Sequence, residues 1–204
     1  MVISEISKSY KSADGSQSVV LDKFSLNVND GDFISVMGPS GSGKTTLLKI
    51  LCGLEKADSG QIIFENKNLC ELGKDNFAEL RRDKIGIVFQ DFCLINNLTV
   101  KENILLPRML LDNMAEEDVE GAEEDAEGNL NRLIDFLGIR DILGEEIVYL
   151  SGGQKQRAAI CRALVNSPKL VLADEPTGNL DAQNTIAVMK YLEEINAKNN
   201  TTIK

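Results

Sequence analysis

The sequence predicts an α/β fold with a mostly parallel sheet, antiparallel strands near the N-terminus and an inserted lobe of helices. Short apolar runs typical of buried parallel strands occur at 33–37, 85–89 and 170–173, and helical patterns alternate with them. Between 19 and 28, apolar and polar residues nearly alternate, as in a half-buried strand. From about 92 to 150 the pattern becomes helical instead, which indicates a lobe inserted into the α/β core.

The first half of the chain alternates strand, turn and helix signals. The strand at 19–28 ends at the turn signal Asp30-Gly31. The run 33–37 leads directly into a glycine-rich segment, and residues 47–54 then place apolar side chains on one helical face. The later elements in chain order are strands at 62–64, 85–89, 170–173 and 201–203, and helices at 130–137, 154–165 and 188–195.

Composition excludes several classes of protein. The 204 residues are 43% apolar and 26% charged, as in ordinary globular domains, so a wholly disordered chain is excluded. No apolar run approaches the ~18–20 residues of a membrane helix, and the N-terminus shows no secretory signal pattern. The four cysteines lie far apart, and we expect reduced thiols packed as small hydrophobic side chains.

The net charge of −10 is concentrated in one acidic segment. Residues 112–128 contain nine acids and no base, and the remainder of the chain carries only −1. We expect this segment to be a solvated loop or the start of a helix, with a docking face for a basic element of a partner as the alternative. The nearly balanced remainder offers no broad basic patch, so no nucleic-acid partner is expected.

A phosphate-binding loop is predicted where the first apolar run ends. The segment from Gly38 to Thr45 fits the pattern G-x-x-x-x-G-K-[ST] between a strand and a helix, although a glycine-rich turn is the alternative. The candidate nucleotide-binding residues are Gly38, Pro39, Ser40, Gly41, Ser42, Gly43, Lys44, Thr45 and Thr46. Lys44 would reach the β- and γ-phosphates, and the Thr45 hydroxyl would bind Mg²⁺.

Two carboxylates follow the apolar run at 170–173. Asp174 stands at the end of this strand, where phosphate-loop nucleotide hydrolases carry the carboxylate on the metal side of the site. Glu175 is the candidate for orienting or deprotonating the attacking water; its alternative is a solvated acid near a helix start. Because the chain has no histidine, acid–base chemistry must rely on such groups.

A further motif makes the chain resemble the ATP-binding-cassette ATPases. Leu150-Ser151-Gly152-Gly153-Gln154 is similar to the signature motif of that family, and the other family motifs occur in the same order across the whole chain. The resemblance implies one domain over 1–204, with a RecA-like P-loop NTPase core, an N-terminal antiparallel β-subdomain and an α-helical subdomain. The core and β-subdomain would take about 1–90 and 154–204, and the helical subdomain about 91–153.

The resemblance also implies roles for residues outside the phosphate loop. Gln90 corresponds to the Q-loop glutamine, which helps to hold Mg²⁺ and links the γ-phosphate to the helical lobe; a polar residue at a strand end is the alternative. Tyr10 corresponds to the aromatic residue that stacks on adenine, with plain packing as the alternative. Asp181 lies in the D-loop. Ser151, Gly152, Gly153 and Gln154 would act in trans, against ATP held by a second copy.

These motifs imply an ATP-hydrolysing subunit that dimerises on ATP and drives a separate polytopic membrane permease. ATP and Mg²⁺ would be the cofactors, and the subunit would lie in the cytoplasm at the inner face of the cell membrane. The segments 37–44, 80–82 and 172–181 are similar to one bacterial branch, which holds the lipoprotein-release, macrolide-export, antimicrobial-peptide-resistance and cell-division ATPases.

One family feature is missing from the sequence. The family carries a switch-loop histidine about thirty residues past the position of Glu175, after a strand that begins like 201–203, and the present sequence ends first. We therefore expect a C-terminally truncated cassette with weak or absent hydrolysis and reduced stability. The alternative function is a nucleotide-gated interaction module without useful turnover. Chromosome-maintenance or translation factors and small-molecule kinases are weaker alternatives.

Overall fold

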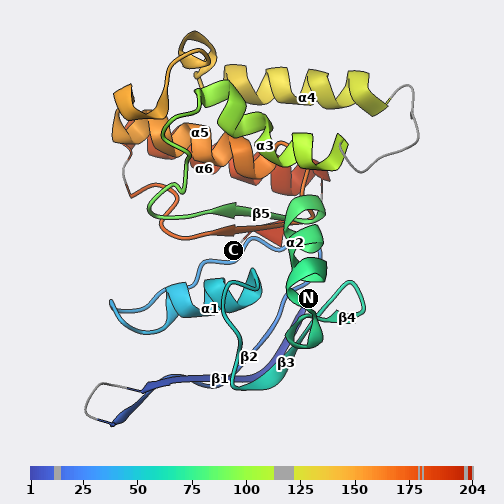
Figure 1. The fold of residues 1–204 in the computed structure, drawn as a ribbon, viewed down its shortest axis with the longest axis vertical. Helices are drawn as coiled ribbons and strands as arrows, with labels where there is room; N and C mark the ends of the chain where they lie inside the picture. The colour runs from blue at the N-terminus through green and yellow to red at the C-terminus, as the bar shows by residue number, and fades with distance from the viewer. Residues whose placement is uncertain (12–14, 113–121, 179, 181, 200–201, 204) are drawn as a thin grey trace.

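The computed structural model describes residues 1–11, 15–112, 122–178, 180, 182–199 and 202–203. Figure 1 shows their arrangement in layers: an antiparallel sheet at one end, then helix α1, then a small parallel sheet, and finally a group of helices at the opposite end. This arrangement confirms the predicted α/β fold with an antiparallel region and a helical lobe.

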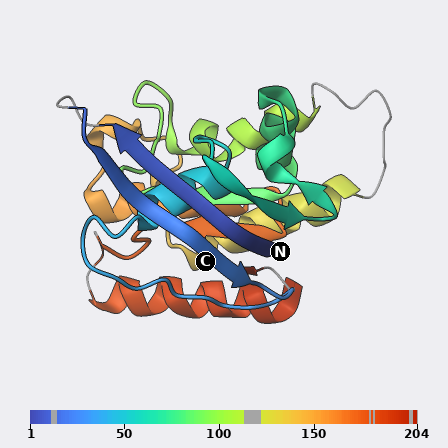
Figure 2. The ribbon, with the colours of Figure 1, turned by 90° about the horizontal axis from the view of Figure 1, so that it is seen from below.

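The antiparallel sheet is built from the N-terminal hairpin and the segment after α1. Its order is β2-β1-β3-β4, with β1 (Val2–Lys11), β2 (Gln17–Asn27), β3 (Ser59–Phe64) and β4 (Lys67–Asn68). Strand β1 is central, and its pairing with β2 shifts register three times. Figure 2 shows this sheet crossing the molecule, with α6 along one edge.

The parallel sheet has the order β5-β6-β7 within the described part of the chain. Strand β6 (Leu170–Ala173) pairs in parallel with β5 (Ile85–Val88) over its whole length and with β7 (Thr202–Ile203) over two residues. The helices are α1 (Lys44–Leu51), α2 (Lys74–Asp83), α3 (Val100–Asp112), α4 (Ala122–Phe136), α5 (Gly152–Leu164) and α6 (Ala182–Asn199). None of the described helices is long and apolar enough to cross a lipid bilayer.

Two hydrophobic clusters hold these layers together. One joins the antiparallel sheet, α1 and α2 to Ile85 of β5 and to Leu170 and Leu172 of β6. The other joins Val88 of β5 and Val171 of β6 to α3, α4, α5 and α6. The second cluster therefore includes both the helical lobe and the parallel sheet, and the predicted boundaries of the helical subdomain at 91 and 153 stay a prediction. Cys52 and Cys161 are buried as expected, whereas Cys70 and Cys93 are exposed.

The predicted buried strand at 33–37 is wrong. Residues 34–37 form no strand, and Met37 is 87% exposed. A run of apolar residues becomes a strand only where a neighbouring strand satisfies its backbone groups. Beyond β6 the described sheet continues only with Thr202 and Ile203, and a cavity lies between residues 33–36 and Leu172, so the run has no partner along most of its length.

Strand β5 approaches helix α5 closely at a glycine. A Cβ on Gly86 would lie 2.2 Å from the Ala163 carbonyl oxygen and 2.9 Å from Pro168. We expect Gly86→Ala to lower the free energy of unfolding by about 1–3 kcal/mol, because the helix must move away from the strand. Thermal unfolding beside Gly144→Ala, whose Cβ would meet nothing within 4 Å, checks this. Equal melting temperatures for the two variants would contradict the packing described here.

Candidate functional site

The candidate phosphate loop leads into helix α1, which begins at Lys44. Gly41 and Gly43 have φ of 80° and 90°, a backbone region that glycine adopts without strain. A Cβ on Gly43 would also lie 2.8 Å from the Val20 carbonyl oxygen, so the β-subdomain packs against the loop. The Lys44 ammonium donates to the carbonyl oxygens of Gly38 and Pro39, at 2.8 and 2.9 Å, and is thereby held over the loop.

The candidate metal-binding pair comes from two distant parts of the chain. The Thr45 hydroxyl donates to the Asp174 carboxylate at 2.9 Å, although 129 positions separate the two residues. The Asp174 amide donates to the Val88 carbonyl oxygen at 2.9 Å, which continues the β5–β6 ladder and fixes the carboxylate at the strand end. Mg²⁺ binds oxygen ligands and usually takes few from the protein, so this hydroxyl–carboxylate pair fits that ion.

Glu175 and Gln90 are also brought together. The Gln90 side-chain amide donates to the Glu175 carboxylate at 3.1 Å, so a residue that follows β5 contacts a residue that follows β6. Glu175 has a φ of 50°, a conformation that is costly for a residue with a side chain and that concentrates at functional sites. The turn after it is closed by the Gly178 amide, which donates to the Glu175 carbonyl oxygen at 3.1 Å.

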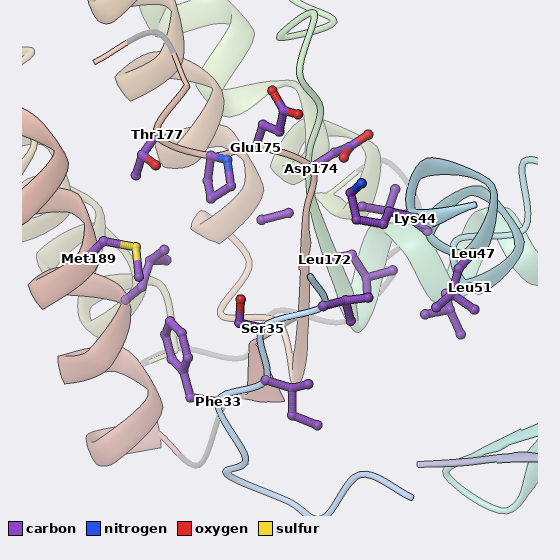
Figure 3. Close-up of a pocket in the computed structure, with 16 residues that line it drawn as sticks. Phe33, Ser35, Lys44, Leu47, Leu51, Leu172, Asp174, Glu175, Thr177 and Met189 are labelled. Carbon is purple, nitrogen blue, oxygen red and sulfur yellow. The ribbon is translucent and has the colours of Figure 1, made fainter. Parts of the chain in front are cut away.

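Lys44, Asp174 and Glu175 border one cavity of about 320 Å³. Figure 3 shows Lys44, Asp174 and Glu175 grouped at one end of it, while apolar side chains such as Phe33, Leu172 and Met189 line the rest. A cation and two acids thus converge beside the loop, with an apolar cavity behind them. This separation of polar and apolar lining is suited to a charged ligand that stays at the polar end.

Tyr10 lies beside the first turn of α1, which follows the phosphate loop. Its hydroxyl is 3.5 Å from the Thr46 hydroxyl on α1, and its side chain is 39% exposed. The ring is therefore close to the phosphate loop and still accessible to a ligand.

The candidate signature motif forms the start of α5. Ser151 is the N-cap: its hydroxyl accepts from the Gln154 amide at 3.3 Å, and the Gln154 side chain accepts from the Ser151 amide at 2.8 Å. Ser151 and Gly152 are exposed, and within the described part of the chain no hydrogen bond joins this motif to the phosphate loop. Asp181 lies outside the described residues, as do residues 113–121 of the acidic segment.

Comparison with known proteins places these features in a family. The model of the family described as "ABC transporter" matches residues 21–178, from strand β2 to the turn after Glu175. The chain belongs to the ABC transporter family. The match covers the phosphate loop and the signature motif, and the resemblance seen in the sequence is confirmed.

Individual relatives place the cassette in the predicted branch. YxdL of Bacillus subtilis, an ABC transporter ATP-binding protein, is 42% identical over 98% of this chain and 74% of its own length. LolD of Legionella pneumophila, from a lipoprotein-releasing system, is 41% identical over 96% of the chain and 84% of its own. MacB of Campylobacter jejuni, a macrolide export ATP-binding/permease protein, is 37% identical over 92% of the chain and 28% of its own.

A solved structure confirms the fold of the cassette. A dimeric structure of the ATP-binding cassette MJ0796, in a post-hydrolysis state with ADP and Pi, superposes with a TM-score of 0.87. The sequences are 35% identical, and the match covers 99% of this chain and 85% of that one. The cassette fold, with an antiparallel β-subdomain and a helical subdomain, is thus shared over nearly the whole chain.

Sequence reasoning missed Arg162, which supports the segment after Gln90. Its guanidinium donates to the carbonyl oxygens of Phe92 at 2.7 Å and Cys93 at 2.5 Å, and both residues have positive φ. Burial lowers the pKa of Arg162, against the opposing effect of Cys93. The available signal was a basic residue inside the apolar stretch 158–164.

The bond between Thr45 and Asp174 leads us to expect that the Mg²⁺ requirement of phosphate release depends on Asp174. We expect Asp174→Asn to raise the Mg²⁺ concentration that half-saturates phosphate release by about tenfold or more, because removing a charged ligand weakens a hard-cation site. Titration of Mg²⁺ at saturating ATP measures this, with Asp91→Asn on the exposed loop as the control. An unchanged Mg²⁺ requirement in Asp174→Asn would exclude this carboxylate from the metal site.

Proposed function

We propose that this cassette binds ATP with Mg²⁺, hydrolyses it at the interface of a head-to-tail homodimer, and thereby drives a separate polytopic membrane permease. The observation that carries the proposal is the grouping of Lys44, Asp174 and Glu175 at one end of a single cavity, where Asp174 accepts a hydrogen bond from Thr45 and Glu175 accepts one from Gln90. These residues come from distant parts of the sequence, so it is the fold that brings them together.

Each residue has a task that follows from its chemistry. The loop amides and the start of α1 favour a phosphate, and Lys44 neutralises charge on the β- and γ-phosphates. Thr45, Asp174 and Gln90 would supply oxygen atoms for Mg²⁺, which would neutralise phosphate charge when bound. Glu175 orients the attacking water and accepts its proton as the water attacks the γ-phosphate and the bond to the β-phosphate oxygen breaks.

A second copy is needed because the signature motif does not reach the phosphate loop of its own chain. The exposed start of α5 presents backbone amides and a positive helix end, which suit a γ-phosphate held by another molecule. Ser151, Gly152 and Gly153 would complete that site, with Gln154 holding the cap. The MJ0796 cassette, described as dimeric and bound to ADP and Pi, supports this arrangement.

The membrane partner is inferred from the relatives. MacB is described as an ATP-binding/permease protein, and the present chain matches 28% of its length. We propose that the cassette couples to a permease of this kind and lies at the cytoplasmic face of the cell membrane. Gln90, bonded to Glu175 at the site, connects hydrolysis to the helical lobe that would contact the permease.

Steady-state phosphate release tests the proposal. We expect release with Mg-ATP to rise more steeply than linearly with protein concentration, because only the dimer holds a complete site. Release that stays strictly proportional to protein concentration would contradict the dimeric site. Lys44→Ala serves as the control for contaminating ATPases, and co-purification of a polytopic membrane protein tests the permease partner.

A further inference from the structure

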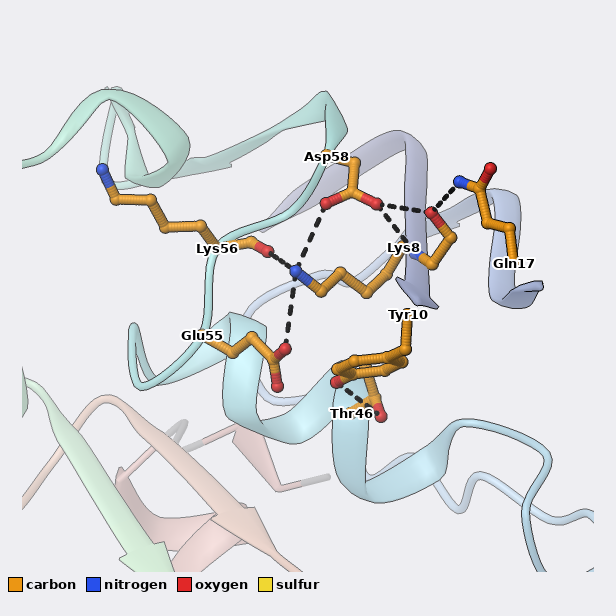
Figure 4. Close-up of polar contacts among 8 residues, drawn as sticks. Lys8, Tyr10, Gln17, Thr46, Glu55, Lys56 and Asp58 are labelled. Atoms are coloured by element: carbon orange, nitrogen blue, oxygen red, sulfur yellow. Dashed lines mark hydrogen bonds and ion pairs between the residues drawn. The ribbon is translucent and has the colours of Figure 1, made fainter. Parts of the chain in front are cut away.

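An ion-pair network ties strand β1 to the loop that follows α1. The Lys8 ammonium donates to the Lys56 carbonyl oxygen at 2.8 Å and lies 3.2 Å from Asp58 and 3.4 Å from Glu55. The second Asp58 oxygen accepts from the amide and the hydroxyl of Ser9, at 2.8 and 3.0 Å. Figure 4 shows this network beside Tyr10.

Lys8 also contacts the ring of Tyr10. Its ammonium lies 5.4 Å from the ring centroid, within the range of a cation–π interaction. The two residues are separated by one position on β1, so both side chains lie on the same side of the strand. With the cation over one face and the hydroxyl close to Thr46, the ring is restrained while 39% of the side chain stays exposed.

The surroundings of Lys8 favour its charged form. Burial opposes the charged form, but the hydrogen bonds and charges of Asp58 and Glu55 outweigh it and raise the pKa of Lys8. The side chain of Lys8 is only 13% exposed, so the cation is confined between its two acids and the ring. An exposed pair of this kind would contribute little, whereas a confined cation with three oxygen partners holds one geometry.

We propose that Lys8 is a positioning residue of the base-binding part of the site, which fixes the Tyr10 ring for stacking on the adenine of ATP. Asp58 and Glu55 anchor Lys8 to the loop after α1, while Tyr10 meets the first turn of α1 at Thr46. Strand β1 thus contacts both the first turn of α1 and the loop that follows this helix. The inference rests on the proposed function, because it requires ATP to bind at this loop.

Comparing the binding of ATP with that of inorganic tripolyphosphate shows whether Lys8 supports recognition of the base or the structure of the phosphate loop. Inorganic tripolyphosphate carries the phosphates of ATP without the base, so calorimetric titration of both ligands with Mg²⁺ isolates the contribution of stacking. We expect Lys8→Met to weaken ATP binding by about 3- to 30-fold and to leave tripolyphosphate binding unchanged. Lys11→Met, on the same strand, is the matched control, and Lys8→Arg restores most of the affinity.

A double variant that combines Tyr10→Ala with Lys8→Met shows whether Lys8 acts through Tyr10. In a Tyr10→Ala background, we expect Lys8→Met to have no further effect on ATP binding. If Lys8→Met does not fold, Asp58→Asn replaces it, since it loosens the anchor and leaves the lysine and the ring in place. The same base-selective loss is expected from that variant.

The outcomes distinguish this inference from the proposed function. Equal weakening of ATP and tripolyphosphate by Lys8→Met overturns the inference, because Lys8 then acts on the phosphate loop. A Tyr10→Ala effect on ATP without any Lys8→Met effect overturns it as well, while the proposed function stands. If the unmodified chain binds neither ligand, the proposed function fails and the inference fails with it.

Discussion

Glu175→Gln is expected to stop hydrolysis while ATP still binds. The substitution keeps the size of the side chain and its contact with Gln90, but an amide cannot accept the proton of the attacking water. We expect the single-turnover rate of hydrolysis to fall by about 100- to 10,000-fold, the usual contribution of a positioned general base. ATP affinity is expected to stay close to that of the unmodified chain, since Gln can keep the hydrogen bond that Glu175 accepts from Gln90.

The same variant is expected to accumulate as a dimer when Mg-ATP is present. Hydrolysis is the step that would open the interface, so blocking it leaves ATP between the two copies. Rapid-quench hydrolysis and sedimentation velocity measure the two effects, with Glu145→Gln as an exposed-acid control. A Glu175→Gln chain that hydrolyses ATP at the unmodified rate would exclude Glu175 as the base.

Lys44→Ala is expected to weaken binding of the nucleotide strongly. The ammonium is held over the phosphate loop by the carbonyl oxygens of Gly38 and Pro39. A hydrogen bond to a charged group contributes about 1.5–3 kcal/mol, so the dissociation constant for ATP is expected to rise by about 10- to 150-fold. The loss arises in binding, whereas that of Glu175→Gln arises in the chemical step.

Calorimetric titration with Mg-ATP checks this second prediction. Lys49→Ala, on the exposed side of the same helix, is the matched control. An ATP affinity in Lys44→Ala equal to that of Lys49→Ala would place the nucleotide away from this loop.

The sequence predicted the elements whose patterns are local. The alternating strand β2, the parallel strands β5 and β6 and the helix α5 lie close to their predicted positions, because their apolar spacing or capping residues specify them. Helix α2 was missed because Phe77 and Leu80 are its only buried residues and most of its other residues are charged. Helix α3 was missed as a separate element because Pro107 lies inside it.

The site was only partly predictable for a different reason. The types of residue in the phosphate loop and at Asp174 and Glu175 follow from motif spacing, and the order of motifs indicated the family. The contacts between Thr45 and Asp174 and between Gln90 and Glu175 depend on how β5 and β6 are paired, which no local pattern contains. The wrong prediction of a strand at 33–37 has the same cause, since a strand forms only where a neighbouring strand pairs with its backbone, and the local sequence does not specify that neighbour.

The central claim is that each site is shared between two copies, and mixing two inactive variants tests it most directly. Lys44→Ala damages the phosphate loop. Gly153→Asp places a negative charge at the start of α5, where it repels a γ-phosphate but favours the helix. Each variant alone is expected to be inactive, and the mixture is expected to hydrolyse ATP, because a mixed dimer contains one intact site. A mixture as inactive as its components, while the unmodified chain hydrolyses ATP, would contradict the shared site.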